Sequence, residues 1–149
     1  MTEPIYQQVS AEVKIAMKAR EKDRVAALRL VMSEFKRVEI DERIEIDDKR
    51  ALIILDKMVK QRKDSLKQFE DAGRDDLARI EALEIAIIGE FLPDQLGADE
   101  VAQIVTRAID QSAATGMQDM GKVMAIVKPQ VQGRADMGEI SSLVKSQLG

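Results

Sequence analysis

Apolar residues recur at three- and four-residue spacing along the whole chain, which is the period of one face of an α-helix. The first such stretch runs from about Glu3 to Ala19. No segment of useful length alternates between apolar and polar residues, and the Val/Ile runs are too short for a parallel sheet. The pattern therefore predicts an all-α protein. The apolar face of the first predicted helix carries Ile5, Val9, Val13, Ala16 and Met17.

Three further helices are predicted before residue 93. The second helix begins near Asp23. The helical pattern is interrupted between about Ile44 and Asp48, where charged residues disturb the apolar spacing. The expected inward faces are Val25, Leu28, Met32, Phe35 and Val38 on the second helix, Leu52, Leu55, Met58, Val59, Leu66 and Phe69 on the third, and Leu77, Ile80, Leu83, Ile87 and Phe91 on the fourth.

Residues with specific backbone preferences mark the ends of these helices. Asp48 is predicted to cap the N-terminus of the third helix, because a short acidic side chain can accept a bond from a free backbone N–H. Gly73 suits the left-handed position that follows a helix. The fourth helix is expected to run from about Asp75 until Pro93 ends it, since proline disfavours helix in the preceding residue.

The segment Pro93–Gly97 also separates two parts of different charge density. Residues 1–92 carry 38 charged side chains, whereas residues 93–149 carry 12. Long, highly charged amphipathic helices are typical of bundles. We therefore predict a domain at 1–92, an antiparallel bundle of about four helices, followed by a smaller three-helix domain at 93–149. The expected helices of the second domain are Asp99 to about Ala114, ended by Gly116; about Met120 to Val127, ended at Pro129; and a last helix after Gly133, with Asp136 as its cap and Glu139 three residues on.

The composition removes most familiar catalytic machinery. The 149 residues include no Cys and no His, which excludes disulfides, thiolate metal sites, cysteine nucleophiles, imidazole bases and Ser-His-Asp triads. The formal net charge of -4 gives no global attraction to nucleic acid or to anionic membranes. No apolar run approaches the roughly 18 residues of a membrane span. The first residues resemble no signal peptide, so we expect a cytoplasmic location.

Three short motifs are better explained as helix features than as catalytic sites. Gly116–Val123 has the spacing of a phosphate loop, but Val123 replaces the magnesium-binding Ser/Thr and a helix precedes it. We interpret it as a helix C-cap at Gly116 followed by a new helix. Ser142 and Lys145 have the S-x-x-K spacing of acyl enzymes without the companion motifs. A Glu81/Glu84 pair lacks the histidines of di-iron bundles. No catalytic, cofactor-binding or metal-binding residue is predicted.

Basic residues and methionines remain as candidate binding groups. Two basic groups in the first part are interleaved with acids and are interpreted as solvated helix faces: Lys14, Lys18, Arg20, Lys22 and Arg24, and Lys57, Lys60, Arg62, Lys63 and Lys67. The second part has five basic residues, of which Lys122, Lys128, Arg134 and Lys145 lie in or near glycine-containing segments. Its four methionines either fill a small core or form an adaptable partner surface: Met117, Met120, Met124 and Met137.

Five ordered segments resemble the YqeY-like proteins of the GatB/YqeY family across nearly the whole chain. This resemblance implies two helical domains. The segments are Lys60-Gln-Arg-Lys-Asp-Ser65, Gly73-Arg-Asp-Asp-Leu77, Phe91-Leu-Pro-Asp-Gln-Leu96, Asp119-Met-Gly-Lys-Val-Met124 and Gly133-Arg-Ala-Asp136.

The family in turn is similar to the C-terminal tail of the B subunit of the tRNA-dependent aspartyl/glutamyl amidotransferase. In that subunit the tail contacts tRNA, whereas the kinase and glutaminase sites lie elsewhere. The residues that match the tail pattern are Gly121, Val123, Met124, Gly133, Arg134 and Ala135.

The resemblance therefore implies a non-catalytic helical module that binds tRNA or a tRNA-handling protein. The expected contact residues are Gly121, Lys122, Lys128, Gly133, Arg134 and Lys145. Two alternatives stay open. One is a protein–protein adaptor that uses the methionines of the second domain. The other is participation in a carbon–nitrogen ligase with glutamine as amido-N-donor, as the family label implies. No cofactor, metal or membrane partner is expected, and the sequence makes no prediction of the oligomeric state.

Overall fold

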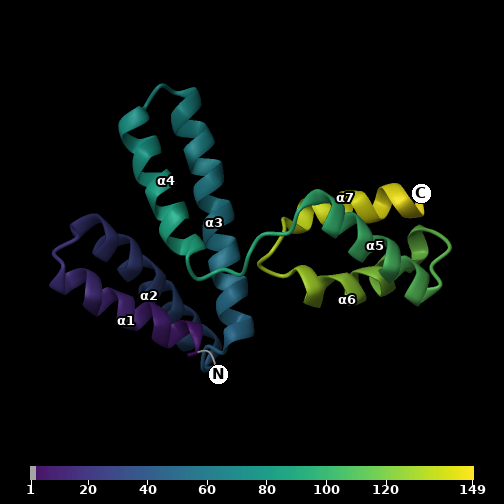
Figure 1. Ribbon diagram of the computed structural model, residues 1–149, viewed down its shortest axis with the longest axis horizontal. Helices are drawn as coiled ribbons and strands as arrows, with labels where there is room; N and C mark the ends of the chain where they lie inside the picture. Colours follow the sequence, from purple (N-terminus) through teal and green to yellow (C-terminus); the bar gives the residue numbers. More distant parts are fainter. Residues whose placement is uncertain (1–2) are drawn as a thin grey trace. The chain divides into compact units, whose positions relative to one another are not determined.

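The computed structural model describes residues 3–149, and the regular structure of these residues is entirely helical (Figure 1). The all-α prediction is confirmed. The elements are α1 (Ile5–Lys18), α2 (Lys22–Glu42), α3 (Asp48–Asp71), α4 (Asp75–Gly89), α5 (Ala98–Ser112), a single 3₁₀ turn η1 (Met117–Asp119), α6 (Met120–Val131) and α7 (Met137–Leu148).

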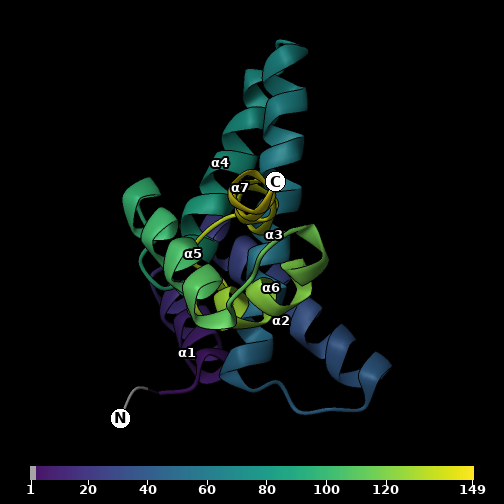
Figure 2. The same cartoon turned by 90° about the vertical axis from the view of Figure 1, so that its right-hand side faces the viewer.

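The chain divides into two compact units, one ending at Pro93 and the other running from Asp94 to Gly149. In the first unit α1 packs against α2, and α3 packs against α4, so the four helices form two hairpins. The α3/α4 hairpin is seen side by side in two perpendicular views (Figures 1 and 2). Further contacts of α2 with α3 and α4, and of α1 with α3, join the hairpins into a bundle.

The helix junctions of the first unit differ in detail from the sequence prediction. Asp47, rather than Asp48, is the N-cap of α3, and its Oδ1 accepts a bond from the Arg50 N–H at 2.8 Å. Asp48 is free for another role because it is already in the helix. Its Oδ1 accepts a bond from the Ile5 N–H at 2.8 Å, which ties the start of α1 to the start of α3.

The end of α4 also differs from the prediction, whereas the end of α3 confirms it. Gly73 follows α3 with a φ of 70°, the left-handed conformation that glycine adopts at no steric cost. Helix α4 ends at Gly89 and not at Pro93. Beyond Gly89 the backbone hydrogen bonds are of the tighter i→i+3 kind. The Phe91 N–H donates to Ile88 O at 3.1 Å, and the Leu92 N–H donates to Gly89 O at 3.2 Å.

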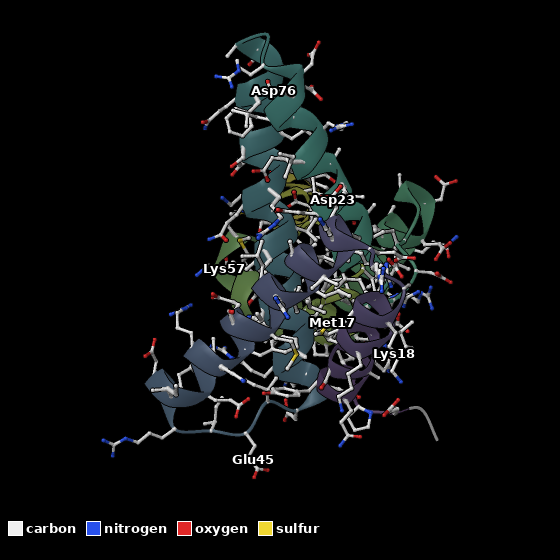
Figure 3. All side chains as sticks on the ribbon, turned by 90° about the vertical axis from the view of Figure 1, so that its left-hand side faces the viewer. Met17, Lys18, Asp23, Glu45, Lys57 and Asp76 are labelled. Atoms are coloured by element: carbon white, nitrogen blue, oxygen red, sulfur yellow. The ribbon has the colours of Figure 1, made fainter. Side chains whose placement is uncertain are left out.

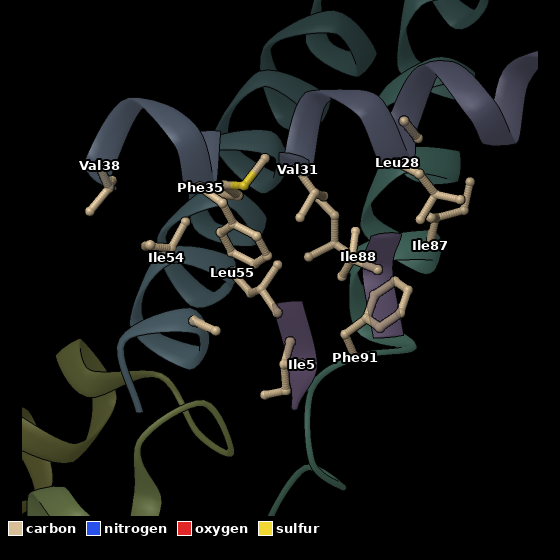
Figure 4. Packing of buried hydrophobic residues seen from close by; sticks show 14 of the residues in the cluster. Ile5, Leu28, Val31, Phe35, Val38, Ile54, Leu55, Ile87, Ile88 and Phe91 are labelled. Atoms are coloured by element: carbon tan, nitrogen blue, oxygen red, sulfur yellow. The ribbon is translucent and has the colours of Figure 1, made fainter. Parts of the chain in front are cut away.

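Side chains from all four helices form the core of the first unit (Figure 4). Phe35, Leu28 and Leu55 are its largest fully buried side chains, and the rings of Phe35 and Tyr6 stack with centroids 5.3 Å apart. Burial of this kind is the main favourable term in folding. Three residues predicted to face inward are exposed instead: Met17, Ile80 and Leu83.

Salt bridges formed by two arginines link the helices of the first unit. Arg24 of α2 donates to Glu12 of α1 at 3.1 Å and to Glu90 at 2.6 Å. Arg62 of α3 donates to Glu84 of α4 at 2.8 Å. Both arginines belong to basic groups that were interpreted as solvated faces. The structure shows that these two join helices and carry a structural role.

The second unit is a group of three helices, α5, α6 and α7, around its own core (Figure 1). Its fully buried side chains include Val105, Val127 and Ile140. Within 3–149, none of the helices in either unit is long and apolar enough to cross a membrane.

Two helices of the second unit end at residues other than those predicted. Helix α5 ends at Ser112, two residues before the predicted end at about Ala114, and Ala113 rather than Gly116 ends it in the left-handed conformation, with a φ of 56°. The N–H of Ala114 donates to Ile109 O at 3.2 Å, and Ala114 packs on the core, as in a Schellman ending. Helix α6 continues through Pro129 to Val131. Burial of Val131 favours this last turn despite the bond that proline cannot donate.

Candidate nucleic-acid interface

Helix α6 carries three of the predicted contact residues on its exposed surface. Its inner face is the buried stripe Val123, Val127 and Val131, spaced by four residues. At 100° per residue, Gly121 and Lys128 lie seven positions apart and so share one outer face. Lys122 lies six positions from Lys128, about 240° around the axis, and therefore occupies another face. Gly121 and Lys128 therefore share one face of α6, two turns apart, whereas the two lysines lie on different faces.

The turn between α6 and α7 holds Gly133 and Arg134 in a fixed conformation. Gly133 is buried and has a φ of 76°, which a side chain would strain. The N–H groups of Arg134 and Ala135 both donate to Val131 O, at 2.8 and 3.2 Å. Asp136 then caps α7 by accepting from the Gly138 N–H at 2.7 Å, which confirms the predicted start of the last helix.

Residues 94–96 bind this turn through three hydrogen bonds that the sequence analysis did not anticipate. The Leu96 N–H donates to Arg134 O at 2.8 Å, and Gln95 Nε2 donates to Gly133 O at 3.0 Å. In return, Arg134 Nε donates to Asp94 O at 3.2 Å. The only sequence signal for this pairing is that both segments belong to the family-like motifs. These bonds hold the Arg134 guanidinium at its Nε beside the turn.

Asp119 organises the entry to α6 and pairs with Lys122. Its Oδ2 accepts from the Thr115 N–H at 3.0 Å, and its Oδ1 lies 3.7 Å from Lys122 Nζ. The hydrogen bond from Thr115, helped by the Lys122 charge, holds the pKa of the Asp119 carboxyl below its usual value of 3.8. Lys122 is thus partly neutralised by the residue that immediately precedes α6.

This lowered pKa predicts a pH-dependent contribution to the stability of the second unit. A carboxyl with a folded pKa below its unfolded value stabilises the fold above the unfolded pKa, and the effect is lost as pH falls through the folded pKa. Asp119→Asn is therefore expected to lower the thermal midpoint of the second unit at pH 7. The difference from the parent chain should shrink as pH falls below about 4. Circular dichroism melting at several pH values measures this, and a pH-independent difference would contradict it.

The other three candidate cations differ in exposure, since Lys128 and Lys145 are exposed and Arg134 is half-buried. Lys145 is exposed in the last turn of α7, one position after the buried Val144. Within the part of the chain that the structure describes, neither Lys128, Arg134 nor Lys145 has a carboxylate oxygen within 4 Å. Each therefore keeps its positive charge available for an anionic partner.

The methionines of the second unit divide into two kinds. Met117 is 45% exposed, whereas the other three are half-buried and pack against the core. The half-buried methionines therefore serve as core residues, one of the two roles predicted from the sequence. The half-buried methionines are Met120, Met124 and Met137.

The motifs with catalytic spacing have structural explanations. Gly116 has extended backbone, with a φ of -173°, and leads into η1, so the predicted C-cap at this residue is wrong. The predicted new helix does follow, as α6. Ser142 Oγ donates to Gly138 O at 3.1 Å within its own helix. Glu84 pairs with Arg62, while burial and the Glu84 charge raise the pKa of Glu81. Residues 3–149 hold no group of acidic side chains arranged for a metal ion.

The protein is all-helical over residues 3–149 and has a four-helix bundle and a smaller three-helix unit. The turn between α6 and α7 carries the cation Arg134. A match to the Yqey-like protein family spans residues 6–148, and the chain therefore belongs to that family.

Two curated fungal proteins are similar to part of the chain. Uncharacterized protein C22F3.15 of Schizosaccharomyces pombe is 34% identical over 79 residues, which are 53% of this chain and 64% of that protein. Altered inheritance of mitochondria protein 41, mitochondrial, of Clavispora lusitaniae is 36% identical over 84 residues, 56% of this chain and 49% of that protein. The chain thus spans less than two-thirds of the length of either relative.

Proposed function

We propose that the second unit is a non-catalytic module that binds tRNA through phosphate contacts. The observation that carries the proposal is that three predicted contact cations of the second unit have no carboxylate oxygen within 4 Å among residues 3–149: Lys128, Arg134 and Lys145. Phosphate contacts by such side chains supply most of the affinity of nucleic-acid binding, because each contact releases counterions. The similarity of the family to an amidotransferase tail that contacts tRNA supports tRNA as the partner.

The local geometry supports two distinct kinds of phosphate contact. Gly121 is exposed and has no side chain, so its backbone is open to solvent. No heavy atom of another residue lies within 4 Å of the position that a Cβ would occupy there, the backbone of its own helix aside. A phosphate can therefore approach that face of α6 beside Lys128. At the turn, the bond from Arg134 Nε to Asp94 O fixes one edge of the guanidinium and reduces the entropy lost on binding. The proposal assigns the chain no bond-making step of amide transfer.

A salt titration of tRNA binding tests this proposal. Fluorescence anisotropy with labelled tRNA gives the affinity at several salt concentrations for the parent chain and for a Lys128→Gln/Lys145→Gln double variant. Each lost phosphate contact reduces the slope of log K against log salt by about 1, so the double variant should reduce it by about 2. A Lys60→Gln/Lys63→Gln variant removes the same charge from the first unit and is expected to leave the slope unchanged.

Two results would contradict the proposal. One is absence of salt-sensitive tRNA binding tighter than about 100 μM, the weak end of non-specific binding. The other is an equal loss of slope in both double variants, which would indicate attraction to overall charge. A protein that copurifies with the chain while tRNA does not bind would favour the adaptor alternative.

A further inference from the structure

A shallow, open surface depression of about 400 Å³, called the cavity below, lies in the first unit where the end of α1 meets the first two turns of α2. The lining residues from α2 follow one face of that helix, at positions i, i+3, i+4 and i+7. Among the residues that the structure describes, the lining is Met17, Arg20, Lys22, Val25, Ala26 and Arg29. None of these lining residues belongs to the proposed tRNA interface.

The cavity combines apolar and cationic side chains. Met17, Val25 and Ala26 supply apolar surface, and the Met17 side chain is half exposed, 49%, at the surface where α1 and α2 pack together (Figure 3). Arg29 Nη2 lies 3.7 Å from Met17 Sδ, so the cation borders the apolar part of the lining. A ligand that fits this surface needs an apolar body next to an anionic group.

None of the described residues that line the cavity is acidic. The neighbouring Glu21 has its carboxylate 3.8 Å from Arg24 Nε, and Arg24 is not a lining residue. Within residues 3–149, neither Arg20, Lys22 nor Arg29 has a carboxylate oxygen within 4 Å. Three positive charges therefore remain available to an anionic head group.

Arg20 occupies this rim at a backbone cost. Its φ of 59° is left-handed, in the position after a helix where glycine is preferred. Its N–H donates to Met17 O at 3.2 Å, and the next N–H, that of Glu21, donates to Ala16 O at 3.1 Å. These bonds form the helix ending and would form equally well with glycine. Strained backbone often marks functional positions, and here it places a cation beside the cavity.

We propose that this cavity binds a small amphiphile with one anionic head group and an apolar body, of the size of a medium-chain fatty acid. The head group contacts Arg20, Lys22 and Arg29, and the apolar body covers Met17 and Val25. The site is separate from the tRNA interface, so either proposal can fail without the other.

The anionic fluorophore 1-anilinonaphthalene-8-sulfonate is a direct probe of this site. We expect saturable binding with one site per chain, displacement by decanoate, and no displacement by decanol or inorganic phosphate at the same concentration. Arg20→Gly should weaken binding about tenfold, the effect of losing one charge-assisted bond. Arg43→Gly is the matched control, because Arg43 is also left-handed, with a φ of 54°, and is not a lining residue.

Stability and the apolar contact provide two further readouts. Both glycine variants relieve left-handed backbone, so neither should lower the thermal midpoint, and weaker binding by Arg20→Gly then reflects the lost cation. Met17→Gln should also weaken binding several-fold, whereas Ile15→Gln should not, since Ile15 is equally solvent-exposed on α1 but lies outside the lining.

Three results would overturn the proposal. They are no saturable binding of the fluorophore, equal loss of affinity in Arg20→Gly and Arg43→Gly, and displacement by phosphate as effective as by decanoate. The last of these would identify a site for free phosphate.

Discussion

Replacing Phe35 by alanine is expected to destabilise the first unit by about 3–5 kcal/mol, because a buried ring is lost and a cavity is left behind. Phe35 is fully buried in a core built from side chains of all four helices (Figure 4). Its ring also stacks on that of Tyr6. A loss of this size approaches the whole stability of a small domain. The first unit of this variant should therefore be largely unfolded or melt at a much lower temperature.

The aromatic residues make this result measurable for the first unit alone. The chain has no Trp, and its one Tyr and three Phe all precede residue 93. Tyr6 fluorescence and the near-ultraviolet circular dichroism thus report on the first unit, while far-ultraviolet circular dichroism reports on both. In urea titrations, the Tyr6 transition should move to a lower midpoint in Phe35→Ala.

Ile40→Ala is the matched control for this prediction. Ile40 lies on the same helix as Phe35 but is 75% exposed, so truncation leaves no cavity. We expect a change within about 0.5 kcal/mol, as for most surface substitutions. Similar losses in the two variants would show that Phe35 is not a core residue.

Replacing Gly133 by alanine is expected to destabilise the second unit by about 1–2 kcal/mol, the cost of a left-handed backbone for a residue with a Cβ. The effect is large for a unit of only 56 residues, from Asp94 to Gly149, because such small units bury little surface. Alanine would also disturb the turn whose carbonyl accepts from Gln95 Nε2. The anchored position of Arg134 should be lost with it.

Gly121→Ala is the control for this substitution because the same atom is added in a helix. Gly121 lies in α6 with open space around the added Cβ, so alanine should stabilise the unit by about 0.5–1 kcal/mol. Hydrogen exchange of the α6 and α7 amides measures the stability of the second unit alone, without a contribution from the first unit. Equal stability of the two variants would contradict the conformation assigned to Gly133.

The helices and much of the core could be predicted from the sequence, because apolar spacing is a local signal. Val9, Leu28, Phe35 and Leu55 were all placed on inward faces, and all are fully buried. Errors arose where tertiary contacts decide the outcome. Helix α6 passes Pro129 because Val131 packs into a core that the sequence alone does not reveal.

The candidate interface could be predicted only as a set of residues. Which of them share a face of α6 follows from the helix register once its buried stripe is known. The anchoring of Arg134 to Asp94 O could not be predicted, because it joins positions forty residues apart through a backbone carbonyl that carries no sequence signal. The separate roles of Arg24 and Arg62 were hidden for a similar reason, since their acidic partners lie on other helices.

Amide chemical-shift mapping with tRNA is the most direct measurement of the proposed function. Labelled chain is titrated with tRNA, and the shifts are followed residue by residue at low and high salt. We expect salt-sensitive shifts that concentrate at Gly121, Lys128, Gly133, Arg134 and Lys145, with little change in the first unit. Shifts confined to the first unit, or none at low salt, would contradict the assignment of tRNA binding to this surface.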